Sequence, residues 1–117
     1  MPIGIEALGA ATVVTIAGEV DLAVEEPLRD ALDRACDAGT QVVVVDLTAT
    51  TFMDSTALGA LVDAHRRLEA RGGRMRVVAP QGAVRRVLEL TALVGPLGVV
   101  ERRDEALGDL DDERPGP

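Results

Sequence analysis

The stretch VVVVDLTATTFMDSTALG, residues 42–59, decides the fold class of this chain. Four consecutive valines place apolar side chains on both faces of a strand, as in a central strand with a parallel neighbour. The polar, threonine-rich stretch from Asp46 to Phe52 then predicts a loop, and from Leu58 onward apolar residues recur at helical spacing. A strand, a loop and a helix in this order are typical of an α/β domain.

Strand and helix patterns alternate on both sides of this stretch. Before it we expect a hairpin of strands over residues 3–8 and 12–17, a loop over 18–21, and a helix from about residue 24 that ends near Gly39. After it we expect a helix over 55–71, a strand over 74–79, a helix opened by Pro80, a short strand at 99–100 and a helix over 104–110. The sequence therefore predicts one α/β domain, in which a mixed β-sheet of four to five strands packs against helices.

The composition excludes several classes of protein. The chain has 117 residues, enough for one core, and its 12 basic residues, all arginine, stand against 20 acidic ones, for a net charge of −8. This balance argues against direct nucleic-acid binding, which needs a basic face, and the single aromatic residue, Phe52, gives no stacking platform. Because the sequence has no apolar run of membrane-spanning length and no signal peptide at its start, we expect a cytoplasmic protein with no membrane insertion.

Catalytic and metal-binding chemistry find little support. The lone cysteine, Cys36, can form no intrachain disulfide, and with the lone histidine it makes no recognisable zinc site. His65 lies on the apolar stripe of the predicted helix, where a core-edge position is favoured over general-base catalysis. Asp46 ends a predicted central strand, as a phosphoacceptor aspartate does, but the chain has no lysine to contact a phosphoryl group. We therefore expect no enzyme activity, no cofactor and no metal.

Asp54, Ser55 and Thr56 stand directly before the helical period. We expect Asp54 or Ser55 to cap the helix by accepting a first-turn N–H, which is worth about 1 kcal/mol. Ser55 would also be accessible to a kinase, and a phosphate there adds about −1.5 to −2 charges. The helix dipole and free amides would accept this dianion, while Asp54 would oppose it. The fold should survive such a modification, and a partner docked over it should not.

Residues 54–59, Asp-Ser-Thr-Ala-Leu-Gly, resemble the Asp-Ser-Ser/Thr-Gly-Leu-Gly signature of STAS domains, the sulphate transporter and anti-sigma factor antagonist family. Residues 18–21, Gly-Glu-Val-Asp, resemble the family's Gly-Glu-Leu-Asp loop, and residues 43–52, 72–80 and 84–93 match in order and spacing. The resemblance covers about residues 12–107. We assign residues 1–110 to the STAS domain and 111–117 to an acidic tail that we expect to be disordered.

The resemblance implies a binding protein without enzyme activity. In stand-alone bacterial members, an anti-sigma factor that is also a serine kinase binds the unmodified domain and thereby releases the sigma factor. Phosphorylation of the serine after the signature aspartate ends the interaction, and a phosphatase resets the cycle. By position, the phosphorylation site is Ser55, and the predicted partner-binding residues are Asp21, Asp54, Thr56, Ala57 and Gly59.

Two residues depart from the family pattern. Ala57 stands where the signature often has glycine, and Ala92 stands where the third helix commonly ends in Ser-Gly. These differences bear on the identity of the partner more than on the mechanism. The alternative function is that of a STAS subunit in a lipid-transport or stress-signalling assembly, which would use the same fold and the same surface.

Overall fold

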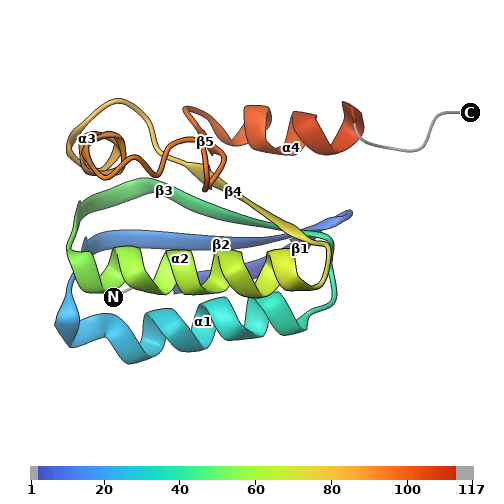
Figure 1. The fold of residues 1–117 in the computed structure, drawn as a ribbon, viewed down its shortest axis with the longest axis horizontal. Helices are drawn as coiled ribbons and strands as arrows, with labels where there is room; N and C mark the ends of the chain where they lie inside the picture. Colours follow the sequence, from blue (N-terminus) through green and yellow to red (C-terminus); the bar gives the residue numbers. More distant parts are fainter. Residues whose placement is uncertain (1–2, 113–117) are drawn as a thin grey trace, which may run out of the picture.

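Within residues 3–112, which the computed structural model describes, five strands form one mixed sheet in the order β1-β2-β3-β4-β5 (Figure 1). The strands are β1 (Ile3–Leu8), β2 (Ala11–Val20), β3 (Val42–Met53), β4 (Arg74–Val78) and β5 (Val99–Val100). β1 is antiparallel to β2, and each later neighbour is parallel. The predicted α/β domain with a mixed sheet is thus confirmed.

Helices cover both faces of this sheet. They are η1 (Leu22–Val24), α1 (Glu25–Asp37), α2 (Ser55–Ala70), α3 (Ala83–Leu90) and α4 (Arg103–Asp112). The side chains of β2 alternate between the two faces: Val14 and Ile16 join the core beneath α1, α2 and α3, whereas Val13 packs with Ala106 of α4. Figure 1 shows α1 and α2 on one side of the sheet and α4 on the other.

A buried carboxylate fixes α4 to the sheet. Asp46 of β3 accepts a hydrogen bond from Arg103 Nε at 3.0 Å through Oδ2, and from Thr48 N at 2.9 Å through Oδ1. A second nitrogen of Arg103 donates to the Thr15 hydroxyl of β2 at 3.1 Å. From this anchor α4 runs along the sheet and ends far from the first turn of α2 (Figure 1).

The structure corrects two predicted loops. Residues 46–52 are not a loop, because β3 continues without interruption to Met53. Their threonines suit an extended chain, and the buried Thr50 donates its hydroxyl to the Ile16 carbonyl oxygen at 2.8 Å, so this side chain is satisfied within the sheet. Residues 18–20 likewise continue β2 beside β3, across register shifts and with Gly18 at φ +88°.

Smaller differences concern the ends of elements. Pro80 does not open a helix: α3 begins three residues later, after Gly82 at φ +150°. α4 begins one residue before the expected helix and reaches Asp112, two residues beyond its expected end. Residues 113–117 of the expected acidic tail lie outside the described residues.

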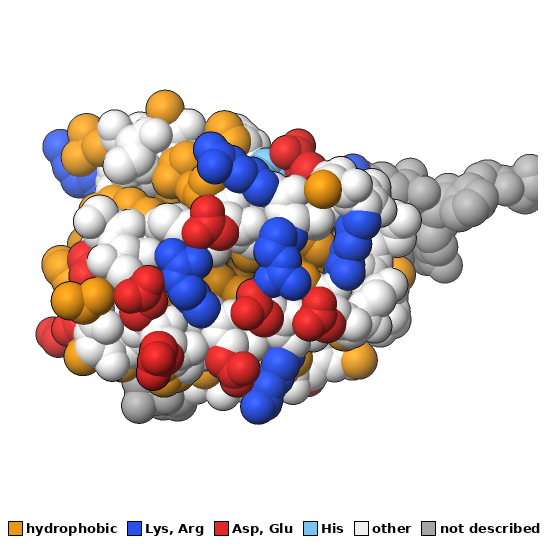
Figure 2. Space-filling model, turned by 60° about the horizontal axis from the view of Figure 1, so that its bottom comes forward, with side chains coloured by type: hydrophobic (Ala, Val, Ile, Leu, Met, Phe, Trp, Pro, Cys, Tyr) orange, Lys and Arg blue, Asp and Glu red, His pale blue; other side chains and the backbone are white. Residues whose placement is uncertain are grey.

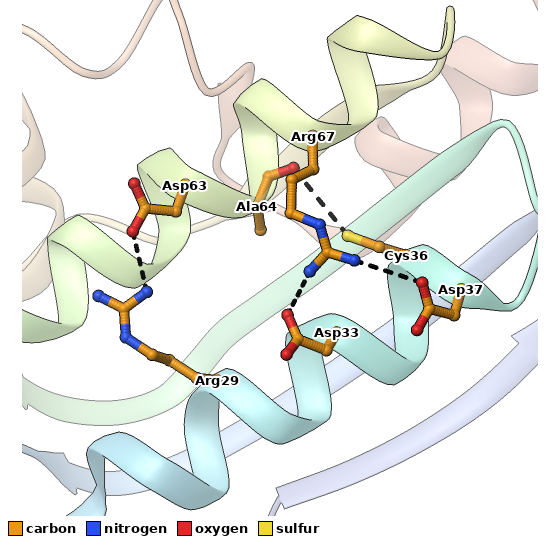
Figure 3. A network of polar contacts seen from close by, with 7 residues as sticks. All are labelled: Arg29, Asp33, Cys36, Asp37, Asp63, Ala64 and Arg67. Atoms are coloured by element: carbon orange, nitrogen blue, oxygen red, sulfur yellow. Dashed lines mark hydrogen bonds and ion pairs between the residues drawn. The ribbon is translucent and has the colours of Figure 1, made fainter.

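Ion pairs join the outer faces of α1 and α2. Arg29 of α1 donates to Asp63 of α2 at 2.9 Å, and Arg67 of α2 donates to Asp33 and Asp37 of α1 (Figure 3). Hydrogen bonds to Asp63 and to Glu25 raise the pKa of Arg29. Acidic and basic side chains therefore alternate over this face of the molecule (Figure 2).

Candidate functional site

The ends of β2 and β3 bring two acidic residues together. Val20 pairs with Met53 in the parallel register, and the N–H of Asp54 donates to the Val20 carbonyl oxygen at 3.1 Å. Asp21 and Asp54 therefore follow neighbouring strand ends. Both were predicted from the sequence as partner-binding residues, and the strand order explains their proximity.

Each of these acids caps the helix that follows it. Asp21 Oδ1 accepts from the N–H of Ala23 at 3.0 Å, at the start of η1. Asp54 Oδ1 accepts from the N–H of Ala57 at 3.0 Å, at the start of α2. Of the two residues that the sequence offered as caps for α2, Asp54 is the one that serves.

Ser55 is the first residue of α2, and its side chain is exposed. Among the described residues, its hydroxyl has no hydrogen-bond partner, because the cap is supplied by Asp54. Its own N–H and that of Thr56 belong to the first helical turn, which has no internal acceptor for them. The hydroxyl is thus presented to solvent at the positive end of a helix dipole.

Two large apolar side chains are exposed near the ends of β2 and β3. Leu22, in η1, is 67% exposed, and Phe52, next to the end of β3, is 51% exposed. We call Asp21, Leu22, Phe52, Asp54, Ser55 and Thr56 the β2/β3 corner. The sequence pattern indicates neither Leu22 nor the exposure of Phe52, because a strand that continues to Met53 is needed to turn Phe52 away from the core. In Figure 2 apolar side chains gather at the end of the molecule where η1 and the first turn of α2 lie.

The remaining predicted contact residues are less accessible than Ser55. Ala57 is buried and packs in the core beneath the sheet. Gly59, in the second turn of α2, faces α1, where an added Cβ would lie 3.9 Å from the Arg29 guanidinium. Thr56 is half-buried beside Ser55.

The two residues considered for catalysis lie outside the corner. His65 is half-buried, and its Nε2 lies 3.4 Å from Glu69 on the next turn of α2. Cys36 is buried between α1 and α2, and this burial raises the pKa of its thiol. Among residues 3–112, no three His, Cys, Asp or Glu side chains are placed to share a metal ion, and no helix is long and apolar enough to cross a membrane.

The family model of the STAS domain matches residues 3–106, from the first residue of β1 into α4. The chain belongs to the STAS domain family. The match includes the whole β2/β3 corner of this STAS domain, and it confirms the resemblance found in the sequence.

Several relatives are similar to this STAS domain over most of their length. An anti-sigma F factor antagonist of Paenibacillus polymyxa is 26% identical over 100 residues, covering 85% of this chain and 86% of the relative. A crystal structure of an anti-sigma factor antagonist from Mycobacterium paratuberculosis superposes with a TM-score of 0.88 at 28% identity, covering 95% and 94% of the two chains. The Bacillus protein SpoIIAA, solved in unphosphorylated and phosphorylated forms, shares the fold at 24% identity, with TM-scores of 0.72 and 0.69.

Proposed function

We propose that this STAS domain is an anti-sigma factor antagonist of the cytoplasm, a binding protein rather than an enzyme. In its unmodified form it binds an anti-sigma factor that is also a serine kinase, and so releases the sigma factor. The kinase phosphorylates Ser55, which ends the interaction, and a phosphatase restores the hydroxyl. The names of the relatives support the class of function, and the geometry of the corner supports the mechanism.

The observation that carries the proposal is that Asp54 caps α2, which leaves the Ser55 hydroxyl free of any structural hydrogen bond within the described part of the chain. Asp54 holds the helix start through Ala57 N, so the exposed hydroxyl of Ser55 makes no contribution to that cap. A kinase can reach this oxygen and modify it without breaking a hydrogen bond of the fold. Thr56, the other hydroxyl in the first turn, is half-buried and is the weaker acceptor.

A phosphate on Ser55 would act on the partner and leave the domain folded. It brings about −1.5 to −2 charges to a surface that already carries Asp21 and Asp54. The dipole of α2 offsets part of this repulsion inside the domain. A partner that docks on these acidic side chains and on the first turn of α2 instead meets a bulky, hydrated dianion.

The chemistry of the corner also describes the surface of the partner. Acidic side chains at the strand ends favour a basic rim, and two exposed apolar side chains favour an apolar hollow at its centre. Complementary charge accelerates association at low ionic strength and loses its effect as salt rises. We therefore expect an association rate that falls with salt concentration.

The decisive experiment is a capture experiment with three forms of the chain. The unmodified chain should retain an anti-sigma factor kinase, and Ser55→Asp should lose it. Gln41→Glu is the matched control, because it adds one charge to an exposed side chain before β3, at the opposite end of that strand from Ser55. Equal retention by Ser55→Asp and by Gln41→Glu would contradict the switch, and retention of transporter subunits in place of a kinase would favour the alternative assembly.

Two further measurements test individual residues. Incubation with the captured kinase and ATP, followed by peptide mass mapping, should place phosphate on Ser55; phosphate on Thr56 alone would overturn the assignment. Asp21→Asn keeps a side-chain oxygen for the η1 cap and removes the charge. It should slow association at low salt and leave the melting temperature unchanged, whereas an unchanged rate across a salt series would reduce Asp21 to a cap.

A further inference from the structure

β1 forms an open edge of the sheet. Within the described residues it pairs only with β2, so every second residue directs its N–H and C=O away from the domain. Such an edge is usually protected by lysine, proline or a bulge. β1 has none of these over residues 3–8, and its one charged residue, Glu6, lies 3.5 Å from Arg103. Ile5 and Leu8 are 39% and 37% exposed.

A shallow groove continues this edge onto α1. Ile3 and Ile5 of β1 line it from one side, and Pro27, Asp30 and Arg34 of α1 line it from the other. α1 runs in the same direction as β1, because it returns the chain between the parallel strands β2 and β3, and β1 is antiparallel to β2. One side of α1 thus lies alongside the free edge.

The charged residues on this side of α1 can pair with the same residues of a second copy of the chain. Asp30 and Arg34 lie one helical turn apart, 3.2 Å from each other, and both are largely exposed. A twofold axis perpendicular to the sheet places two copies of α1 antiparallel on the same face. Asp30 of one copy then lies near Arg34 of the other, and the reverse pair forms as well.

The side-chain pattern of β1 selects the register of such a pair. Ile3 and Ile5 face α1, whereas Glu6 faces Arg103 on the α4 side. Residues directly opposite in an antiparallel pair share a face, so odd-numbered residues must meet odd-numbered ones. Pairing centred on Glu6 would oppose two like charges, whereas pairing centred on Ile5 opposes two apolar side chains and sets Glu6 against Gly4.

We propose that β1 is a homodimerisation edge, at which two copies of this chain pair antiparallel through Ile5 and exchange Asp30–Arg34 ion pairs between their α1 helices. The dimer joins two sheets into one of ten strands. It covers the outer edge of β1 and one side of α1, and it leaves both β2/β3 corners open, since these lie at the carboxyl ends of β2 and β3. The contact is narrow, so association is weak and depends on concentration.

Cysteine cross-linking tests the register. Opposite residues of an antiparallel pair place their Cβ atoms about 4.5–5.5 Å apart, close enough for a disulfide after small adjustment. Ile5→Cys should therefore form a covalent dimer under mild oxidation. Leu8→Cys is the matched control, with nearly equal exposure on the same strand, but in this register the two cysteines lie about 20 Å apart. Equal cross-linking of the two variants, or none with Ile5→Cys, overturns the proposal.

Charge exchange tests the contact between helices. The mass measured by sedimentation should rise from that of one chain toward that of two between about 10 µM and 1 mM. Asp30→Arg and Arg34→Asp should each weaken self-association about tenfold or more, and an equimolar mixture of the two should restore it. Arg102→Asp is the control, because the side chains of Arg34 and Arg102 are equally exposed, at 72%. Arg102 lies two residues after the end of β5, the strand at the opposite edge of the sheet from β1. Weakening by Arg102→Asp, or no rescue in the mixture, refutes the interface.

Discussion

Substitution of Ser55 by alanine separates the proposed switch from the stability of the domain. The hydroxyl of Ser55 has no partner among the described residues, while Asp54 supplies the cap of α2. We expect the free energy of unfolding of Ser55→Ala to stay within about 0.5 kcal/mol of the parent, as for most exposed positions. Asp54→Ala should lose about 1 kcal/mol, within the usual range of about 0.5–2 kcal/mol for a lost N-cap.

These free energies correspond to measurable temperatures. For a chain of 117 residues, 1 kcal/mol shifts the melting temperature by about 4 °C. Thermal unfolding followed by circular dichroism should show Ser55→Ala within about 2 °C of the parent and Asp54→Ala about 4 °C below it. Asp54→Asn is the control, since asparagine caps as well as aspartate and should melt close to the parent.

Binding completes this test. Ser55→Ala should bind the partner of the unmodified chain and remain bound after treatment with kinase and ATP, because it lacks the acceptor oxygen. A decrease of about 1 kcal/mol or more in the free energy of unfolding of Ser55→Ala would refute the conclusion that Asp54 alone caps α2. Loss of binding by a normally folded Ser55→Ala would show that the hydroxyl itself makes an essential contact, and the proposed on and off states would be wrong.

Other predictions concern the scaffold. Arg103→Ala leaves the Asp46 carboxylate buried without one of its partners, so urea unfolding should show a loss of about 2 kcal/mol that Asp46→Asn partly restores. Ala92 has φ +59° just after α3, where glycine is preferred, so Ala92→Gly should stabilise the domain by about 0.5–1 kcal/mol. Ala70→Gly, at the last residue of α2 and without a positive φ, should bring no such gain. Burial raises the pKa of the Cys36 thiol above 9.0. Above about pH 9 the unfolded chain releases that proton while the folded chain keeps it, so the free energy of unfolding should fall with rising pH, and less so in Cys36→Ala.

Periodicity predicted the helices and the central strands because those elements bury a regular stripe of side chains. The valines of β3 are buried on both faces, as their position in the sequence indicates, and α2 extends from Ser55 as expected. The second half of β3 was missed because its run of polar residues lacks the alternation of apolar and polar side chains that indicates a strand, although threonine itself favours strands. Their extended conformation depends on the neighbouring β2, to which Thr50 is bonded through Ile16.

The sequence predicted those features of the candidate site that neighbouring residues determine, and it did not predict those that depend on contacts between distant residues. Asp54 and Ser55, directly before an apolar helical pattern, indicate the start of a helix. The pairing of β2 with β3 then brings Asp21 near Asp54. By contrast, the hydrogen bond between Asp46 and Arg103 spans 57 residues, and no local pattern indicates it. The exposure of Phe52 likewise follows from the register of β3 against β2 and not from its neighbours in the chain.

The course of α4 has a practical consequence for experiments and for protein engineering. Its anchor on Asp46 carries the chain along the face of the sheet opposite α1 and α2, and the helix ends at the far end of the molecule from the first turn of α2 (Figure 1). A fluorophore, an affinity tag or a sensor surface attached beyond α4 would therefore stand away from Ser55. The domain can be immobilised or fused through that end with Ser55, the proposed phosphorylation site, facing the solution. If the proposed switch holds, the domain would suit use as an interchangeable input module in synthetic signalling proteins.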